Sequence, residues 1–210
     1  MSIYGLIIGT AAIICLTYFS KHQQIIPKSQ EYFFFFGLLI SALVGARIYH
    51  VLSSLPYYLN QPGQILNIPA GGLGIFGALT FGFIYLFLYS HIYPPVQQAG
   101  HLSFVRLLDL ITPILPLGQS IGRFANYFNH EIPIWWLESL LCLLLFLFIQ
   151  RFPRHPSVKY LIGYGFIRLI TESYRQNTWT IGPINIAYLV SLSFIFLGLL
   201  IYHHRPSPPK

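Results

Sequence analysis

Residues 31–55 read EYFFFFGLLISALVGARIYHVLSSL, and this stretch decides the class of fold. After Glu31 at its start, the one charged residue in the stretch is Arg47. A helix needs about 20 mostly apolar residues to cross the hydrocarbon core of a bilayer. The stretch therefore predicts a transmembrane helix that carries an arginine inside it.

The whole chain has the same character. Of its 210 residues, 8% are charged and 55% are hydrophobic. A soluble domain carries about 25% charged residues, and disorder requires low hydrophobicity. The two cysteines are too few for a disulfide scaffold. The net charge of +7 does not predict nucleic-acid binding, because the basic residues are scattered and form no patch. These numbers predict an all-α polytopic membrane protein with a single domain over residues 1–210.

Seven stretches are apolar enough to be transmembrane helices. They lie near 3–20, 31–55, 71–93, 103–120, 134–151, 159–176 and 184–203. The first has no basic start and no small-residue cleavage site, so it is a span and not a signal peptide.

Basic residues in alternate connections predict the orientation. Eight of the twelve lysines and arginines lie there: Lys21, Lys28, Arg106, Arg151, Arg154, Lys159, Arg205 and Lys210. Segment 55–70 has none. Because cytoplasmic loops are enriched in Lys and Arg, we expect the N-terminus outside and the C-terminus in the cytoplasm.

Apart from Glu31, which lies at the cytoplasmic start of a span, the remaining charges fall within spans or toward their outer ends. They are Arg47, Arg123, Arg168, Arg175, Asp109, Glu131, Glu138 and Glu172. A charged residue at the centre of a span costs about 2.5–3.5 kcal/mol on insertion scales. Residues kept at that cost are candidates for function.

Four polar residues form a stripe in the sixth span. Tyr164, Arg168, Glu172 and Arg175 are spaced i, i+4, i+8 and i+11, so they share one helical face. An Arg168–Glu172 pair that locks helix packing is the simpler interpretation. That pair does not account for Tyr164 and Arg175, and an arginine without an acidic partner suits an anionic ligand such as phosphate.

A second polar segment, GQSIGRFANYFNHE, covers residues 118–131. Its side chains that can bind an oxygen-rich ligand are Arg123, Asn126, Asn129, His130 and Glu131. The alternative is a polar helix end followed by a solvated loop.

The third segment is a glycine run: Gly71, Gly72, Gly74, Gly77 and Gly82. Small residues at such spacing are typical of close helix packing. The functional alternative is a backbone cradle for a lipid headgroup.

Two acids have simple interpretations. Asp109 follows Arg106 by three residues, which favours a salt bridge. Glu138 lies beside Trp135 and Trp136, which are typical of a membrane interface. The sequence shows no spacing of metal ligands and no nucleotide motif, so no cofactor is expected.

Five further features follow one another along the chain: GARIY at 45–49, GGLGIFG at 71–77, the segment 109–131, the segment 133–138, and 163–176 with its arginines. With these motifs in this order, the chain resembles the bacterial prolipoprotein diacylglyceryl transferases. Members of that family move the diacylglyceryl group of phosphatidylglycerol to the lipobox cysteine of a prolipoprotein signal peptide. A thioether forms at the outer face of the bacterial cytoplasmic (inner) membrane, and glycerol phosphate leaves. The resemblance implies these two substrates and membrane lipids as partners, with no metal and no nucleic acid.

The resemblance also implies roles. Arg123 would bind the lipid headgroup, with Asn126, Asn129 and Glu131 completing that site. Arg168 would act at the phosphate, with Tyr164 beside it. Glu172 would join Arg168 and Tyr164 as a catalytic residue, and Asp109 would have a supporting role. The further substrate-binding residues would be Arg175, Arg47, Gly71 and Gly72.

The chain departs from the family in two places. Phe76 stands where the family has a histidine, and Ala78 replaces a glycine. A phenyl ring transfers no proton, so His50 or His130 could take the role, or the histidine is dispensable. A lipid-binding relative without turnover is the main alternative, and an anion transporter is another, although the paired repeats of transporters are absent. The second departure is a short segment between Glu131 and Pro133, where an extramembrane arm is expected.

Overall fold

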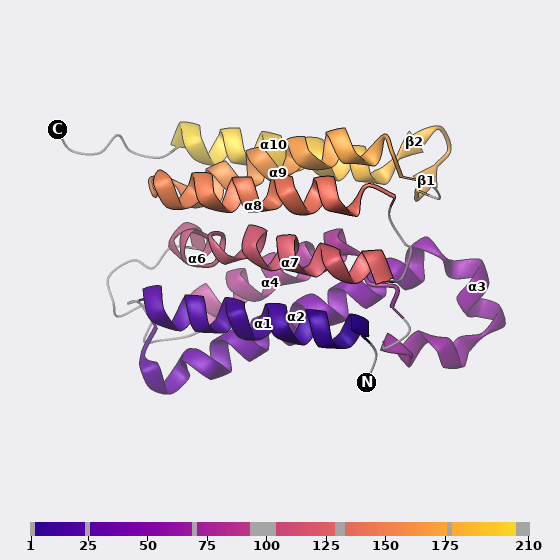
Figure 1. Cartoon of the computed structure of the whole chain (residues 1–210), viewed down its shortest axis with the longest axis horizontal. Helices are drawn as coiled ribbons and strands as arrows, with labels where there is room; N and C mark the ends of the chain where they lie inside the picture. The colour runs from indigo at the N-terminus through magenta and orange to yellow at the C-terminus, as the bar shows by residue number, and fades with distance from the viewer. Residues whose placement is uncertain are drawn as a thin grey trace. The chain divides into compact units, whose positions relative to one another are not determined.

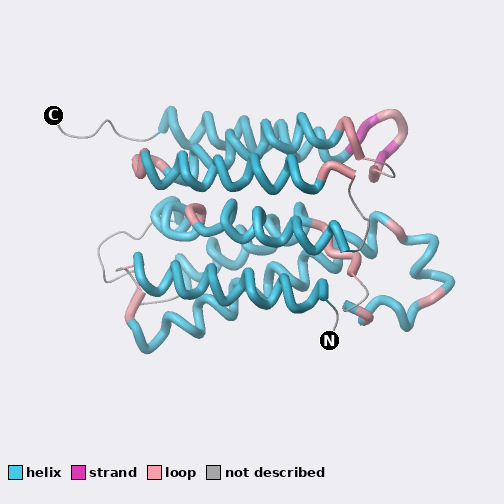
Figure 2. Tube along the Cα trace, viewed as in Figure 1, coloured by secondary structure: helices cyan, strands magenta, loops and turns pink. Residues whose placement is uncertain are grey.

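The computed structural model describes residues 3–23, 26–68, 71–92, 104–128, 133–175 and 178–204. Figure 2 shows that helices make up most of this part of the chain. Two compact units divide it. The first contains Met1–Gly5 and Leu16–Leu108, and the second contains Leu6–Cys15 and Asp109–Lys210.

The first unit is built around two helices that pack side by side, α2 (Lys28–Ser53) and α4 (Ile75–Ile92). It also contains the two ends of α1 (Ile3–His22) and most of α6 (Phe104–Ile111), and the remaining residues of both helices belong to the second unit. The short helices α3 (Leu55–Asn60) and η1 (Pro62–Leu66) follow α2 (Figure 1).

Glycines bring α2 and α4 together. A Cβ atom added at Gly77 would collide with the backbone oxygen of Gly45, and one at Gly45 with that of Gly77. Aromatic rings fill another part of the unit: the fully buried Phe34 meets Tyr89 edge-on at 4.8 Å and lies 5.9 Å from Phe19. The glycine run therefore serves helix packing in this part of α4, as the simpler interpretation predicted.

The second unit holds α7 (Ile114–Phe128), α8 (Trp135–Arg151), α9 (Pro156–Glu172) and α10 (Ile186–His204). α7 packs on α8, α8 on α9, and α9 on α10 (Figure 1). A small antiparallel hairpin of β1 (Thr180–Ile181) and β2 (Ile184–Asn185) joins α9 to α10, with Thr180 opposite Asn185.

The start of α9 is held by an acid from the preceding part of the chain. Oδ1 of Asp109 accepts hydrogen bonds from the backbone nitrogen (3.1 Å) and the hydroxyl (2.6 Å) of Ser157. Satisfying a free N–H in the first helical turn stabilises a helix by about 1 kcal/mol. Asp109 thus supports the start of α9, a role that its spacing from Arg106 did not indicate.

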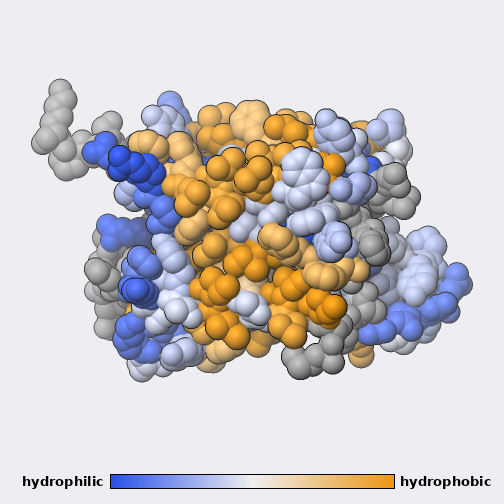
Figure 3. Space-filling view, viewed as in Figure 1, coloured by the Kyte–Doolittle hydropathy of each residue, from blue (hydrophilic) through white to orange (hydrophobic). Residues whose placement is uncertain are grey.

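The outer faces of many helices are apolar. Large side chains such as Phe33, Ile13 and Phe196 are more than 60% exposed. Figure 3 shows hydrophobic residues over the middles of the helices and hydrophilic ones toward their ends. Among the described residues, four helices are long and apolar enough to cross a membrane, and the α6–α7 pair, bent by 43°, gives up to five. The protein is therefore an all-α, multi-pass membrane protein.

Several expected helix boundaries were wrong. The stretch 31–55 breaks at Ser54, because Pro56 restricts the chain there. The helix expected from residue 71 begins at Ile75. The stretch 103–120 is two helices, since Pro113 donates no hydrogen bond to the preceding turn.

Candidate active site

A buried carboxylate on α8 lies at the centre of a cluster of arginines. Glu138 is 0% exposed. Its Oε1 accepts a short hydrogen bond from Nη2 of Arg123 on α7 and lies 3.4 Å from Nη1 of Arg168 on α9. Its Oε2 accepts a 2.8 Å hydrogen bond from Nη2 of Arg175. One carboxylate thus pairs with three arginines, and we call these four residues with Glu172 the arginine cluster.

Glu172 closes the cluster at the end of α9. Its Oε2 accepts a 2.5 Å hydrogen bond from Nη2 of Arg168 and lies 3.8 Å from Nε of Arg175. Its Oε1 accepts from the amide of Asn185 on β2 at 3.3 Å. The expected Arg168–Glu172 pair is therefore present, and it belongs to a larger network.

The polar stripe continues along α9 toward its start. The ring of Tyr164 is fully buried and stacks on Tyr160, with centroids 5.5 Å apart. Tyr164 precedes Arg168 by four residues, which is one turn of the same helix. The hydroxyl of Tyr160 accepts a 2.7 Å hydrogen bond from Gln119 on α7. A line of polar groups thus leads from the interior of this unit to the arginine cluster.

The cluster carries an excess of positive charge. Three arginines face two glutamates, which leaves one positive charge over. The Arg168 side chain is 3% exposed, Arg123 is 10% and Arg175 is 20%. Because Arg175 is the most exposed member, an anion would reach the cluster from its side.

The end of α9 differs from the expected stripe. The helix stops at Glu172 and the chain turns at Ser173 and Tyr174, so Arg175 is not on the helical face with Tyr164. Arg175 still joins the cluster because the turn brings it back, with its backbone nitrogen 3.1 Å from the carbonyl of Glu172.

The other predicted residues of the 118–131 segment are only partly described. Asn126 is half-buried on α7, three residues after Arg123. Asn129, His130 and Glu131 lie outside the described residues.

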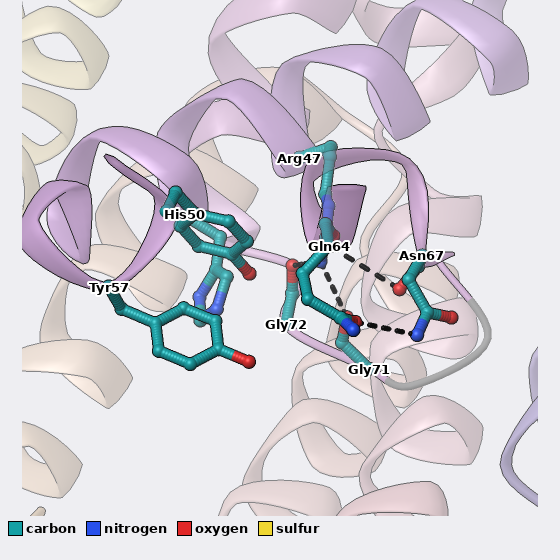
Figure 4. A pocket seen from close by; sticks show the side chains of 8 residues that line it. Arg47, His50, Tyr57, Gln64, Asn67, Gly71 and Gly72 are labelled. Atoms are coloured by element: carbon teal, nitrogen blue, oxygen red, sulfur yellow. Dashed lines mark hydrogen bonds between the residues drawn. The ribbon is translucent and has the colours of Figure 1, made fainter. Parts of the chain in front are cut away.

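In the first unit, Arg47 holds the segment that follows α2. Its Nε and Nη atoms donate to five backbone carbonyls, those of Gln64 (2.5 Å), Ile65 (2.8 Å), Asn67 (3.3 Å), Gly71 (2.8 Å) and Gly72 (3.0 Å). A guanidinium has five N–H donors, so this set uses as many acceptors as Arg47 has donors. Figure 4 shows Arg47 reaching toward Gln64, Asn67 and the two glycines.

These contacts border a cavity of about 210 Å³. Its lining residues are Arg47, His50, Tyr57, Tyr58, Gln64, Asn67, Gly71 and Gly72. Gly71 and Gly72 have φ of 89° and 73°, which L side chains rarely adopt. Both glycines present their carbonyls to Arg47, and a Cβ at Gly72 would lie 2.6 Å from the His50 ring.

Phe76, at the position where a histidine was expected, is a core residue. It is 3% exposed and meets Tyr49 of α2 edge-on, with ring centroids 6.1 Å apart. Of the two histidines considered as replacements, His50 lines the cavity beside Gly72.

Two members of the network were missed in the sequence. Glu138 was interpreted as part of a membrane interface because tryptophans lie beside it, and Asn185 was not singled out. For Glu138 a signal existed: no Lys or Arg lies within four residues of it, so an acid in an apolar helix required a partner from elsewhere. Asn185 offers no such signal, because its role depends on the hairpin that brings it to Glu172.

Comparison with known proteins gives one family. A model of the prolipoprotein diacylglyceryl transferase family matches residues 1–135 and 133–204. The phosphatidylglycerol–prolipoprotein diacylglyceryl transferase of Trichormus variabilis is 31% identical over 98% of this chain and 87% of its own length. Proteins of the same name from Fervidobacterium nodosum (30%, covering 84% and 70%) and Limosilactobacillus reuteri (28%, covering 94% and 84%) are also similar. The chain belongs to the prolipoprotein diacylglyceryl transferase family.

Proposed function

We propose that this protein transfers the diacylglyceryl group of phosphatidylglycerol to the lipobox cysteine of a prolipoprotein signal peptide. Membership of the family and the names of its relatives support this transferase activity. The observation that carries it at the level of residues is the buried arginine cluster with one positive charge in excess. An anionic phospholipid supplies the negative charge that balances it.

The reaction is a displacement at a glyceryl carbon. The cysteine sulfur attacks the carbon that is bonded to the phosphate oxygen, so a C–S bond forms and the C–O bond breaks. The bonding electrons leave with the phosphate oxygen, and the released glycerol phosphate takes up the thiol proton in the balanced reaction. Negative charge grows on that oxygen in the transition state, where fixed cations stabilise it most.

The arginines suit that task. A guanidinium donates two parallel hydrogen bonds to phosphate oxygens and stays charged when buried. In our proposal Arg123 and Arg175 bind the headgroup phosphate, Arg168 stabilises the leaving oxygen, and Tyr164 and Glu172 keep Arg168 in place. Asn126, Asn129 and Glu131 extend the headgroup site, and Arg47 holds Gly71 and Gly72 in their conformation.

We further propose a topology of seven spans in the bacterial inner membrane, with the N-terminus outside. The eight basic residues in alternate connections support it. Helices α8 and α9 have 17 residues each, or about 26 Å at 1.5 Å per residue, slightly less than the hydrocarbon core. Labelling single cysteines at positions 63 and 154 from each side of the membrane checks it, and labelling of both from one side would contradict it.

A headgroup comparison tests the proposed activity. The purified protein is placed in vesicles with a lipobox peptide and either phosphatidylglycerol or neutral diacylglycerol. We expect thioether product with phosphatidylglycerol alone, because diacylglycerol has no phosphate to leave. Product from both lipids would refute the role of phosphate.

A lipid-binding relative without turnover is the second candidate, and Phe76 favours it. Binding of phosphatidylglycerol without any thioether product, under conditions in which a relative from the family is active, would establish that candidate instead.

A further inference from the structure

We infer that Glu138 is a positioning residue that sets the geometry of the three arginines, an inference that rests on the proposed function. Each carboxylate oxygen is used. Oε1 is shared by Arg123 and Arg168, and Oε2 pairs with Arg175. These arginines come from different parts of the chain, so their guanidinium groups converge on one point.

Glu138 is itself held in place without the arginines. The next residue, Ser139, is buried and donates a 2.7 Å hydrogen bond to the backbone carbonyl of Ser120 on α7. This contact fixes the register of α8 against α7, from which Arg123 also projects. The carboxylate is therefore a fixed point at which the long arginine side chains arrive.

The second carboxylate cannot take over this task. Glu172 pairs with Arg168 and Arg175. Among the described residues, Arg123 forms a single ion pair, and its partner is Glu138. Loss of Glu138 would therefore release Arg123 and leave two excess positive charges in the cluster.

The chemistry makes such a fixed point useful. The phosphodiester of the lipid carries one negative charge before reaction, and further charge develops on the leaving oxygen. Arginines released from Glu138 can follow the ground-state phosphate, whereas fixed ones match the transition state better. Loss of Glu138 should thus tighten lipid binding and slow turnover, a combination that a mere packing role does not produce.

The test compares Glu138→Gln, which removes the charge at constant size, with Glu138→Asp, which keeps the charge on a shorter side chain. Glu31→Gln is the matched control, because Glu31 is also a buried carboxylate, 1% exposed and paired with Lys28 at 3.1 Å on α2. For each full-length variant, thermal unfolding, affinity for phosphatidylglycerol and turnover of a lipobox peptide are measured in vesicles.

We expect Glu138→Gln to lower turnover per folded molecule about 100-fold, on the order of the loss of one transition-state contact. It should bind phosphatidylglycerol several-fold more tightly, because a buried cluster gains one unit of positive charge. Glu138→Asp should be at least tenfold faster than Glu138→Gln, and Glu31→Gln should behave as the unaltered protein.

Three results would overturn the inference: unaltered turnover in Glu138→Gln, a loss that matches the loss of folded protein, or weaker lipid binding. If Glu138→Gln does not fold, Glu138→Asp decides. We then expect lowered turnover at unchanged lipid affinity, and unchanged turnover would contradict the inference. If the unaltered protein forms no thioether, the proposed function fails, and the lipid affinity of Glu138→Gln still tests the role of Glu138 by itself.

Discussion

The arginine side chains determine the chemistry at the scale of single residues. Arg123 and Arg168 are almost fully buried and both pair with Glu138 of the neighbouring helix α8, and Arg168 also pairs with Glu172 of its own helix. A buried arginine with fixed partners is already desolvated and oriented, so little reorganisation is needed when negative charge develops. Their value for catalysis lies in this fixed arrangement.

Replacing either arginine should remove the activity. We expect Arg123→Ala and Arg168→Ala each to lower the rate of thioether formation about 10²–10³-fold, because a charge-assisted bond in the transition state is lost. Arg154→Ala is the control, since Arg154 is exposed in the connection before α9. The rate is measured with a lipobox peptide in phosphatidylglycerol vesicles. Near-normal rates in both variants would mean that the site lies elsewhere.

A substitution at Phe76 tests whether the histidine expected at this position would raise the activity. Phe76→His puts an imidazole against Tyr49 in the core between α2 and α4. Burying a polar ring without a partner costs about 1–3 kcal/mol. We expect a lower melting temperature and no gain in thioether formation. A tenfold gain in rate would instead show that the phenylalanine impairs the protein.

At the scale of elements, the contact of α2 with α4 depends on glycine. Gly77→Ala places a methyl group against the backbone of Gly45, and overpacking of this kind costs about 1–3 kcal/mol. Gly82→Ala on the same helix is the control, because its methyl group would meet Leu38 at an ordinary 3.6 Å. Thermal unfolding should show a loss for Gly77→Ala alone, and equal melting temperatures would contradict this contact.

Arg47 fixes the segment between α3 and α4. Arg47→Lys replaces five donors by three, so at least two of the five carbonyls lose their partner. We expect faster hydrogen–deuterium exchange in residues 61–68 and 71–74, with exchange in α10 unchanged. If exchange in residues 61–68 and 71–74 is as slow in Arg47→Lys as in the unaltered protein, Arg47 does not hold this segment.

The sequence allowed the type of the elements to be predicted better than their ends. Long apolar stretches gave the regions of α1, α2, α4, α8 and α10, because a membrane helix must be apolar over most of its length. The breaks at Ser54 and Pro113 divided two of the expected helices. The helix end at Glu172 was not predicted either, and after it Arg175 pairs with Glu138, which is 37 residues away in the sequence.

For the site, the spacing in α9 identified Tyr164, Arg168 and Glu172 because helical periodicity is local. Glu138 and Asn185 could not be assigned in the same way. Their partners are 13 to 37 residues away along the chain, and such pairs are known only once the helices are packed. The one indication of such a distant pair in a sequence is a charged residue in an apolar stretch with no opposite charge nearby.

At the scale of the whole molecule, the few basic residues fall into two groups. Basic residues in the connections predict orientation in the membrane. The other four, Arg47, Arg123, Arg168 and Arg175, pair with buried acids or backbone carbonyls.

Mass analysis of a lipobox peptide tests the central claim most directly. The purified protein is incubated in phosphatidylglycerol vesicles with the peptide, and with a second peptide in which serine replaces the cysteine. We predict that the cysteine peptide gains the mass of one diacylglyceryl group through a thioether, with release of glycerol phosphate, and that the serine peptide does not. An unmodified cysteine peptide, with a folded protein that still binds the lipid, would contradict the account.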